Sequence, residues 1–313
     1  MSQLRFDGRV AVVTGAGRGL GREHALQLGA RGAAVLVNDL GGAPDMTGAD
    51  HGPAESVVSE INAAGGVAAA NFDSVATSDG AHAIVAAAHE RWGRVDIVIN
   101  NAGGSIGPTT IDQLQEADLR RMVDTHLLGA FFVLGAAWPI MVQQHYGRVL
   151  NTASAAAFGI SGMYPYSAVK AGLLGLTRAL AIDGAAHGVK VNALMPLAYT
   201  RLAANVPLPE VREWMERTFR TPQVSAVAVA MVHEDVPFSG EIVSAGGGRA
   251  AKVFFGGVPG FRDADLTPEL VLEQVDAVMD TTASVVIHDG ADELQFLADD
   301  APPESESWLQ DPT

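Results

Sequence analysis

Cysteine is absent from the 313 residues. Without a thiol the chain can form no disulfide and no thiolate metal site, and a cysteine nucleophile is excluded. Long hydrophobic runs are also lacking, and the first nine residues mix polar and charged side chains. The sequence therefore predicts neither a membrane span nor a secretory signal. We expect a cytoplasmic protein with no membrane partner and no metal.

Basic residues are scarce, because 20 Lys and Arg stand against 36 Asp and Glu and give a formal net charge of −16. Nucleic-acid binding needs a basic face, so we expect no nucleic-acid partner. An acidic excess of this kind is typical of a well-solvated surface. Hydrophobic residues, in contrast, make up 48% of the chain, which is enough for a well-buried domain.

Apolar runs typical of strands alternate with longer helical patterns. Several runs are apolar throughout, as in a parallel sheet that is covered on both faces. The alternation predicts an α/β fold, a doubly wound parallel sheet of the Rossmann-like type with right-handed crossovers. The expected strands are Val10–Thr14, Ala34–Asp39, Val67–Asn71, Ile97–Asn100, Arg148–Thr152, Lys190–Met195 and Gly240–Ser244. The expected helices are Gly19–Arg31, Ala54–Ala64, Ser78–Trp92, Glu116–His145 and Pro165–His187.

Three parts of the chain follow from this pattern. Residues 1–249 are expected to form the Rossmann-like domain, interrupted by a Gly-, Pro- and Asp-rich loop at Gly41–Pro53. Residues 250–298 form a C-terminal extension that packs on the same domain or on a partner subunit, with a helix at Pro268–Asp280 and a short strand at Ser284–His288. The acidic tail 299–313 is expected to be disordered.

A glycine-rich string follows the first expected strand and opens the first helix. It reads Thr14-Gly15-Ala16-Gly17-Arg18-Gly19-Leu20-Gly21. Glycine lets the backbone turn tightly and approach a pyrophosphate, while the helix N-terminus offers free N–H donors. Alone, the string would be compatible with an ordinary tight turn. Asp39, at the end of the second strand, makes a dinucleotide site the better interpretation, because a carboxylate there can hold the adenosine ribose hydroxyls.

Asp39 also bears on the choice of cofactor. Its carboxylate would repel a 2′-phosphate, and no basic residue follows immediately, so NAD is the expected cofactor. Arg18 is the opposing signal, because it either reaches a 2′-phosphate or is a solvated surface charge. Further cofactor contacts are expected from Asn101, Ala102 and Gly103, which lie at the carboxyl edge of the sheet where ligands bind in such folds.

Tyr166 and Lys170 lie four residues apart at the start of an expected helix. Residues at this spacing share one helix face, so the hydroxyl and the ammonium can point into one cleft. A nearby cation lowers the pKa of a phenol and makes it a better base. Ser154 precedes Tyr166 by twelve positions and can hydrogen-bond a reacting oxygen. Two ordinary surface residues would show the same Tyr and Lys spacing.

Taken together and in this order, these motifs over residues 5–248 resemble the short-chain dehydrogenase/reductase family. The resemblance implies that Tyr166 is the general acid/base, that Lys170 holds the nicotinamide ribose and lowers the Tyr pKa, and that Ser154 positions the substrate oxygen. It also implies that a hydride passes between the nicotinamide and a carbinol carbon. Pro196 and Thr200 are expected on the nicotinamide side of the cofactor.

The chain departs from the family pattern at two places. His126-Leu127-Leu128-Gly129 stands where the family carries Asn-Leu-x-Gly. His126 therefore either takes over the part of Asn in a water-mediated proton relay or is only a packed helix residue. In addition, Pro196-Leu197 replaces the usual Pro-Gly, which leaves the shape of the nicotinamide-side loop open.

A closer resemblance is to the (3R)-hydroxyacyl-CoA dehydrogenase unit of the peroxisomal multifunctional β-oxidation enzyme. It rests mainly on residues 37–42, 70–75, 126–129 and 136–139 and on Thr267-Pro268-Glu269. It implies that Asp73 and Ser74 lie near the adenine, that the substrate is an acyl-CoA, and that the chain is a homodimer or homotetramer whose extensions help to close the active sites. Small residues on the two long helices would permit their pairing across a two-fold axis.

The predicted function is that of an NAD-dependent oxidoreductase that acts on a secondary alcohol or ketone. The closer resemblance makes a 3-hydroxyacyl-CoA the expected substrate. The alternatives are an NAD(P)-dependent hydroxysteroid, polyol or 3-oxoacyl-carrier dehydrogenase or reductase, and a dinucleotide-sensing binding protein without activity. A CoA ester needs basic groups to offset the acidic net charge. The candidates are Arg201, Arg212, Arg217, Arg249 and Lys252.

Overall fold

The structure is a computed structural model that describes residues 3–201, 208–290 and 292–293. It divides after Lys252 into two compact units, Met1–Lys252 and Val253–Thr313. The segment 299–313, expected to be disordered, lies outside the described residues, as do 294–298 at the end of the expected extension.

Within the described residues, the first unit is built on one eight-stranded sheet in the order β3-β2-β1-β4-β5-β6-β7-β8. Neighbouring strands from β3 to β7 pair in parallel. This confirms the predicted fold class. The strands are β1 (Val10–Thr14), β2 (Ala34–Asn38), β3 (Val67–Asn71), β4 (Ile97–Asn100), β5 (Gly147–Thr152), β6 (Val189–Pro196), β7 (Ile242–Gly246) and β8 (Arg249–Val253).

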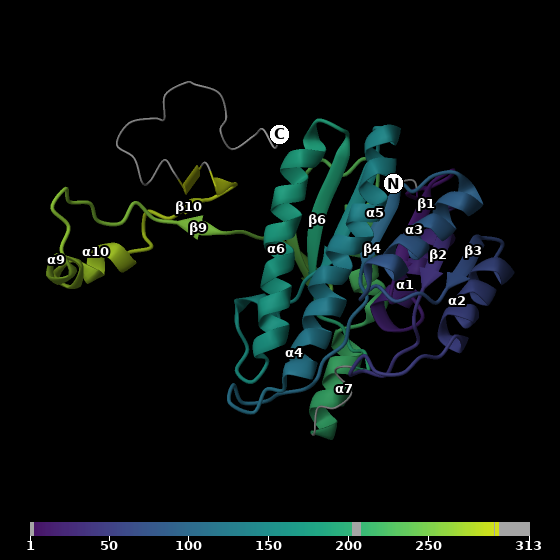
Figure 1. Ribbon diagram of the computed structural model, residues 1–313, viewed down its shortest axis with the longest axis horizontal. Helices are drawn as coiled ribbons and strands as arrows, with labels where there is room; N and C mark the ends of the chain where they lie inside the picture. Colours follow the sequence, from purple (N-terminus) through teal and green to yellow (C-terminus); the bar gives the residue numbers. More distant parts are fainter. Residues whose placement is uncertain (1–2, 202–207, 291, 294–313) are drawn as a thin grey trace. The chain divides into compact units, whose positions relative to one another are not determined.

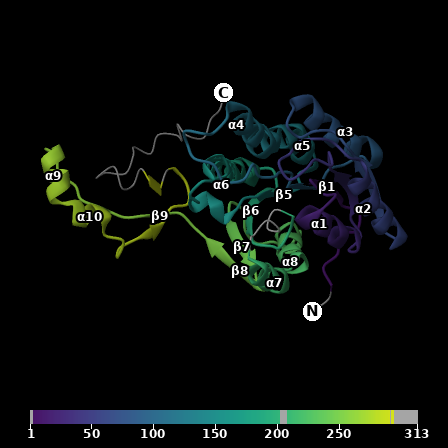
Figure 2. The same ribbon diagram turned by 90° about the horizontal axis from the view of Figure 1, so that it is seen from below.

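Helices cover both faces of the sheet, as the near-continuous apolar strands require. One face carries α1 (Gly19–Gly29), α2 (Gly52–Ala63) and α8 (Thr221–Met231), and Figure 2 shows α1 and α8 on the side opposite to α5 and α6. The other face carries α3 (Ser78–Trp92), α5 (Gly129–Gln144) and α6 (Tyr164–Ala185) (Figure 1). Each face has its own apolar core, so the sheet is buried between two layers.

The strand order reverses between β1 and β4, because β2 lies on one side of β1 and β4 on the other. In a doubly wound sheet, this switch point opens a crevice at the carboxyl ends of the strands. The glycine string, Asp39 and Asn101 all follow strands at this edge. The fold therefore brings together the residues that the sequence singles out.

The long helix expected at Glu116–His145 is continuous but not regular. It consists of α4 (Glu116–Met122), a π-helical turn η1 (Val123–Leu128) and α5, and it ends at His145 with a left-handed φ of 50°. A π-turn inserts one residue and shifts the register of the helix, and such turns are frequent at functional sites. Apolar periodicity cannot distinguish it from an α-helical turn, which is why the sequence predicted one uniform helix.

The same stretch, Glu116–Gln144, is long and apolar enough to span a membrane by length and composition alone. The sequence had led us to expect no run of that length. Its π-turn packs against α6, its α5 segment packs against α3, and Val133, Leu134 and Met141 are buried in the core. Packing on the sheet accounts for the part of the apolar composition that is buried, which is 39% of the most apolar window.

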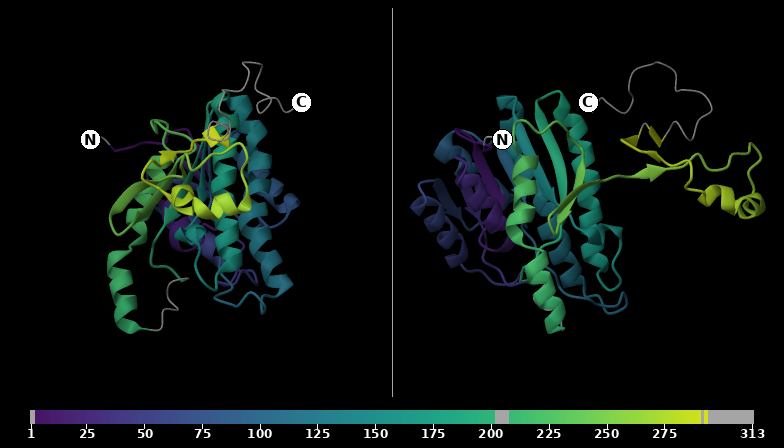
Figure 3. Two further views of the ribbon diagram at one scale, coloured as in Figure 1. Left: turned by 90° about the vertical axis from the view of Figure 1, so that its left-hand side faces the viewer. Right: turned by 180° about the vertical axis from the view of Figure 1, so that it is seen from behind.

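The small residues proposed for helix pairing are divided between the two sides of the helices, because Gly129 is buried whereas Ala171 and Gly175 are exposed. Ala130 and Ala137 are buried, and a Cβ at Gly172 would contact Leu127. The outward faces of α5 and α6, which run side by side in Figures 1 and 3, expose Phe131 and Ile182. The predicted pairing of these helices with a second copy stays a prediction.

Several elements escaped prediction. Helix α7 (Pro209–Thr218) is charge-rich with no buried residue, and α8 is so rich in Ala and Val that it carries no helical polarity pattern. In the second unit, the expected helix at Pro268–Asp280 is divided at Gln274 into α9 (Pro268–Glu273) and α10 (Val275–Met279). The expected strand at Ser284–His288 is only β10 (Val285–Val286), which pairs with β9 (Gly256–Gly257).

Candidate active site

A set of hydrogen bonds fixes the two strands at the switch point. The Thr14 hydroxyl accepts the backbone N–H groups of Asn101 (3.0 Å) and Ala102 (3.1 Å). The Asn101 side-chain amide donates in turn to the carbonyls of Thr14 (3.0 Å) and Gly15 (3.1 Å). These bonds satisfy backbone groups that the diverging strands leave unpaired. Asn101 is therefore primarily a bridge between β1 and the turn after β4.

The glycine string is required by close backbone approach. A Cβ on Gly21 would overlap the Gly15 carbonyl, and a Cβ on Gly15 would lie 2.7 Å from the Cα of Ala102. Gly15 and Gly19 also have left-handed φ angles of 62° and 56°, which glycine adopts at no steric cost. The tight turn leaves the N-terminus of α1 open toward the crevice, the arrangement that binds a pyrophosphate.

Asp39 lies beside this loop and shapes it. One carboxylate oxygen accepts the N–H of Gly17 and the other accepts the N–H of Gly41, both at 2.6 Å. Arg18 turns toward the loop after β2, where it donates to the Gly41 carbonyl (3.4 Å) and pairs with Asp50 (3.3 Å). Arg18, the residue that argued for a 2′-phosphate, is thus engaged with an acidic partner.

A second polar network lies at the ends of β2 and β3. The Asn38 amide donates to the Asn71 side chain (2.8 Å) and to the carbonyl of Asp73 (2.9 Å). The Asn71 amide donates to the Asp73 carboxylate at 2.7 Å. These bonds hold the Asp73 and Ser74 segment at the crevice edge, where the resemblance places the adenine.

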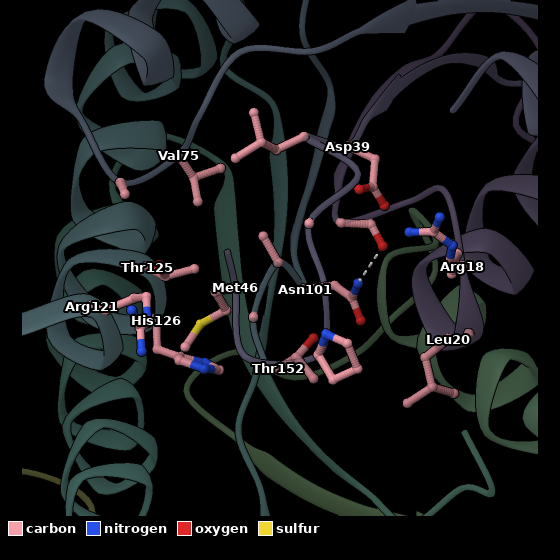
Figure 4. A pocket seen from close by; sticks show the side chains of 18 of the residues that line it. Arg18, Leu20, Asp39, Met46, Val75, Asn101, Arg121, Thr125, His126 and Thr152 are labelled. Carbon is pink, nitrogen blue, oxygen red and sulfur yellow. Dashed lines mark hydrogen bonds between the residues drawn. The ribbon is translucent and has the colours of Figure 1, made fainter. Parts of the chain in front are cut away.

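These elements enclose a cavity of about 800 Å³, a size that accommodates a cofactor. Figure 4 shows Asp39 and Arg18 across it from His126 and Arg121. The predicted residues that line it are Gly15, Arg18, Gly19, Leu20, Asp39, Asp73, Ser74, Asn101, Ala102, Gly103, His126, Ser154, Tyr166, Lys170, Pro196 and Thr200. Gly17 and Gly21 do not line the cavity. They lie behind its wall, where the absence of a Cβ allows the loop to turn.

Ser154, Tyr166 and Lys170 meet on one wall of the cavity. Ser154 ends the segment after β5 and caps the short 3₁₀ helix η2 (Ala155–Phe158), while Tyr166 and Lys170 come from the first turns of α6. The Lys170 ammonium lies 5.5 Å from the centroid of the Tyr166 ring and donates to the Thr152 carbonyl at 2.6 Å. The i, i+4 spacing therefore does place both groups in one cleft.

Burial governs the protonation of both groups. It raises the pKa of Tyr166, and the hydrogen bond with Ser154 opposes this by lowering it. Burial also lowers the pKa of the Lys170 ammonium from 10.5 to about 7. Lys170 thus titrates near neutral pH in the unliganded protein, which suits a group that passes protons.

His126 enters the site from the π-helical turn and is 5% exposed. Its Nε2 lies 2.9 Å from the Gly104 carbonyl, and its ring meets Tyr166 edge-on at 5.5 Å. Burial and the Lys170 charge lower the pKa of His126 well below its usual value, although the Gly104 hydrogen bond raises it. The ring is therefore neutral at physiological pH. Its Nε2 contacts both the carbonyl (2.9 Å) and the N–H (3.2 Å) of Gly104, and its Nδ1 is buried without a hydrogen-bond partner among the described residues.

The side chain of His126 also lines a second, smaller cavity. Its volume is about 10 Å³, roughly one water, and its walls include His126, Thr152 and Lys170. Within the described part of the chain, both His126 Nδ1 and Thr152 Oγ1 are buried without a hydrogen-bond partner. The cavity is thus lined by the two residues that carry these unsatisfied polar atoms and by Lys170.

Some lining residues were not predicted. Met46, Pro44 and neighbouring residues come from the loop after β2, which the sequence marks only as irregular, and Arg120 and Arg121 come from α4. Of the basic residues considered for a CoA ester, Arg201 lines the cavity, whereas Arg212 and Arg217 lie on α7 and Arg249 and Lys252 on β8. Lys252 is paired with Glu241 at 2.8 Å. No local pattern identifies Arg120 or Arg121, because only the fold brings α4 to the crevice.

The family model for short chain dehydrogenase matches residues 9–207. A short-chain type dehydrogenase/reductase of Mycobacterium tuberculosis is 43% identical over 246 residues, covering 78% of this chain and 84% of that protein. A CoA-ester dehydrogenase of Thauera aromatica, the (2S)-[(R)-hydroxy(phenyl)methyl]succinyl-CoA dehydrogenase subunit, is 35% identical over 208 residues, covering 65% of this chain and 79% of that protein.

Longer proteins also contain this unit. The peroxisomal hydratase-dehydrogenase-epimerase of Neurospora crassa is 39% identical over 282 residues, which are 89% of this chain but 31% of that protein. The solved structure of the full-length peroxisomal multifunctional enzyme type 2 of Drosophila melanogaster superimposes with a TM-score of 0.77 at 30% identity, covering 94% of this chain and 49% of that one. The chain thus spans about half or less of these multifunctional proteins, and the predicted resemblance to them is confirmed.

The lowered pKa of Lys170 generates a prediction about stability. In the unfolded chain this lysine is charged up to about pH 10.5, whereas in the folded protein it is charged only below about 7. The folded state is therefore penalised below pH 7, and the penalty fades as the pH rises toward 10.5. Relative to Lys170→Met, the wild-type protein should gain roughly 2–4 kcal/mol of unfolding free energy between pH 7 and pH 10.

Denaturant unfolding of the cofactor-free proteins at several pH values measures this difference. A difference between the two proteins that stays constant from pH 7 to pH 10 would contradict the lowered pKa.

Proposed function

This chain belongs to the short-chain dehydrogenase family, and we propose that it moves a hydride between NAD(H) and the hydroxyl-bearing carbon of a 3-hydroxyacyl-CoA. One observation carries the proposal. Ser154, Tyr166 and Lys170 converge on the same cavity that the glycine loop and Asp39 line from the other side. A reacting alcohol and a dinucleotide can therefore meet in one enclosed space.

The side chains divide the acid–base work among them. In the oxidation direction, Tyr166 accepts the proton of the substrate hydroxyl, and Ser154 holds that oxygen in place through its own hydroxyl. The bound nicotinamide supplies the hydride acceptor, or the donor in the reverse direction. Its cationic oxidised form would add to the charge of Lys170 in lowering the pKa of Tyr166, against the burial that raises it.

His126 takes part by holding a water in the small cavity behind Lys170. His126 Nδ1 and Thr152 Oγ1 have no hydrogen-bond partner among the described residues, and a water in this cavity would satisfy both atoms. In the oxidation direction, the proton that Tyr166 takes from the substrate would pass to Lys170 and then to a water at this point on its way to solvent, and reduction would use the reverse route. This gives His126 the positioning part that Asn has in the family.

NAD is favoured over NADP by the way the ribose end is built. Asp39 is held by two backbone N–H groups, so its carboxylate cannot swing away from an approaching 2′-phosphate. Arg18, the basic residue of the glycine loop, is paired with Asp50. Arg201 also interacts with Asp39, so the preference for NAD requires that the fixed carboxylate outweigh this arginine.

A CoA ester is supported by the relative from Thauera aromatica, whose name specifies a CoA-ester substrate, and by the cavity itself. In a chain with a net charge of −16, the cavity is lined by Arg120, Arg121 and Arg201 in addition to the paired Arg18, and also by Asp39, Asp73 and Asp124. Arg120 pairs with Glu116 and Arg121 with Asp118, but Nε of Arg121 is buried without a partner among the described residues. These arginines offer phosphate groups a local basic contact in an acidic chain.

The chemistry is tested by Tyr166→Phe, which keeps the ring and removes the only proposed proton-transfer hydroxyl. Turnover should fall by about 10²–10⁴-fold, the usual contribution of general acid–base catalysis. Binding of NADH, followed by its fluorescence, should persist and show that the cavity is intact. Near-full turnover on the true substrate would show that another group moves the proton.

Cofactor preference is tested by Asp39→Ala. The wild-type protein should have a higher kcat/KM with NAD than with NADP, and the variant should narrow the gap by about tenfold or more, because a repulsive carboxylate is removed. Asp7→Ala serves as the matched control. It removes an exposed carboxylate that pairs with Arg5 at the surface and does not line the cavity. A wild-type preference for NADP would assign the choice to Arg18 or Arg201.

The substrate class is tested by comparing a 3-hydroxyacyl-CoA with the pantetheine ester of the same acid, which lacks the CoA nucleotide phosphates. KM should be about tenfold lower for the CoA ester, the value of one charge-assisted contact. Added salt should reduce that advantage. Arg120→Ala should reduce it too, whereas Arg91→Ala, an exposed arginine on α3 away from the cavity, should not.

Equal KM values for the two esters would refute the CoA assignment. Turnover of a free hydroxysteroid or polyol with a lower KM would then identify the substrate class instead.

A further inference from the structure

Residues 41–50, between β2 and α2, form a closed loop of their own. At its neck, the N–H of Asp50 donates to the carbonyl of Leu40 at 2.9 Å. A Cβ on Gly41 would overlap the Asp50 carbonyl, so the neck closes only with glycine at this position. Inside the loop, the N–H of Ala43 donates to the backbone carbonyl of Thr47 at 2.8 Å. The segment is therefore a hydrogen-bonded unit with adjacent ends.

The base of this loop is joined to the dinucleotide site. Asp39 accepts the N–H of Gly41 with one oxygen and that of Gly17, in the glycine loop, with the other. Arg18 reaches from the glycine loop to both ends of the neck, the Gly41 carbonyl and the Asp50 carboxylate. The same two side chains thus hold the pyrophosphate turn and the base of the closed loop.

The tip of the loop reaches the opposite rim of the crevice. The carbonyl of Pro44 accepts the N–H of Ser105 at 2.9 Å. A Cβ on Gly104 would overlap that carbonyl and would lie 2.8 Å from Cγ of Met46. Figure 4 shows Met46 on the His126 side of the cavity, away from Asp39 and Arg18. The backbone segments of the two rims therefore touch, and only glycine permits it.

The backbone conformation of Met46 is unusual at this contact. Its φ of 67° is left-handed, a conformation that is uncommon outside glycine and costly for a long side chain. A strained backbone conformation of this kind persists only where surrounding contacts hold it in place. Such conformations are frequent at ligand clamps and switch regions. Here the turn directs the thioether into the cavity that it helps to line.

We propose that residues 41–50 form a strap that crosses the dinucleotide cleft and that its opening sets the rate at which the cofactor leaves. Gly42, Ala43, Pro44 and Met46 line the same cavity as Asp39 on one rim and Gly103 on the other. A dinucleotide seated against the glycine loop lies beneath the strap and passes out when the Pro44–Ser105 bond breaks. The proposal rests on binding of a nicotinamide dinucleotide, not on the substrate.

The neck and the tip have different parts in this motion. Asp39 and Arg18 hold the neck from below, so the neck stays closed while the tip lifts. Motion of loops on this scale occurs in microseconds to milliseconds and often limits product release. A bound cofactor that contacts Met46 from below would hold the tip down and slow that opening.

Two variants open the strap by independent means. Gly104→Ala inserts a methyl group between the rims, where a backbone carbonyl cannot move aside cheaply. Deletion of residues 42–49 removes the strap while joining Gly41 to Asp50, which the neck already holds together. Gly52→Ala is the matched control, because its added methyl lies outside the cavity and meets only the Asp50 carboxylate at 3.3 Å.

The measurement is release of NADH, followed by stopped-flow fluorescence in the absence of substrate. Both opening variants should release NADH at least about fivefold faster than the wild type, and Gly52→Ala should match the wild type within about twofold. Hydrogen exchange is the second readout, since NADH should slow exchange of the Ser105 amide in the wild type but not in Gly104→Ala.

Unchanged release rates in both opening variants, with NADH bound and the far-UV circular dichroism native, would overturn the strap. Because the assay contains no acyl-CoA, failure of the substrate assignment leaves it intact. If the wild type binds NADPH instead, the same rates are measured with NADPH, and the NAD assignment fails while the strap is still tested.

Discussion

The bridge between Thr14 and Asn101 is the interaction on which the site depends. It ties the end of β1 to the turn after β4 where the sheet reverses its order, and so it fixes the floor of the crevice. The glycine loop departs from one side of this bridge and the Gly103–Gly104 turn from the other. Loss of the Asn101 amide would remove one hydrogen bond from each of the Thr14 and Gly15 carbonyls and let both walls shift.

Burial, rather than ion pairing, sets the electrostatics of the catalytic wall. Lys170 and His126 are both removed from water, and each has its charged form disfavoured chiefly by burial. The arginines at the rim stand among acidic partners such as Asp50 and Asp118. Burial thus disfavours charge on the wall that carries Lys170, whereas the rim carries ion pairs.

The sequence predicted those parts of the site that depend on local spacing. The glycine string, the Tyr166 and Lys170 pair and Asp39 each follow from the element in which they lie, and the structure brings them together. It did not predict the π-turn that aims His126, because one extra residue in a helix leaves the apolar pattern intact. Nor did it predict Met46, whose place depends on a contact with Gly104 far away in the chain.

The closed neck at Leu40 and Asp50 has an evolutionary consequence. Because its two ends already adjoin, the intervening segment can lengthen, shorten or be exchanged by recombination without moving β2 or α2. Ser154, Tyr166 and Lys170 lie on other elements. The strap that we propose to set the lifetime of the bound cofactor can therefore change during evolution while these three side chains keep their places.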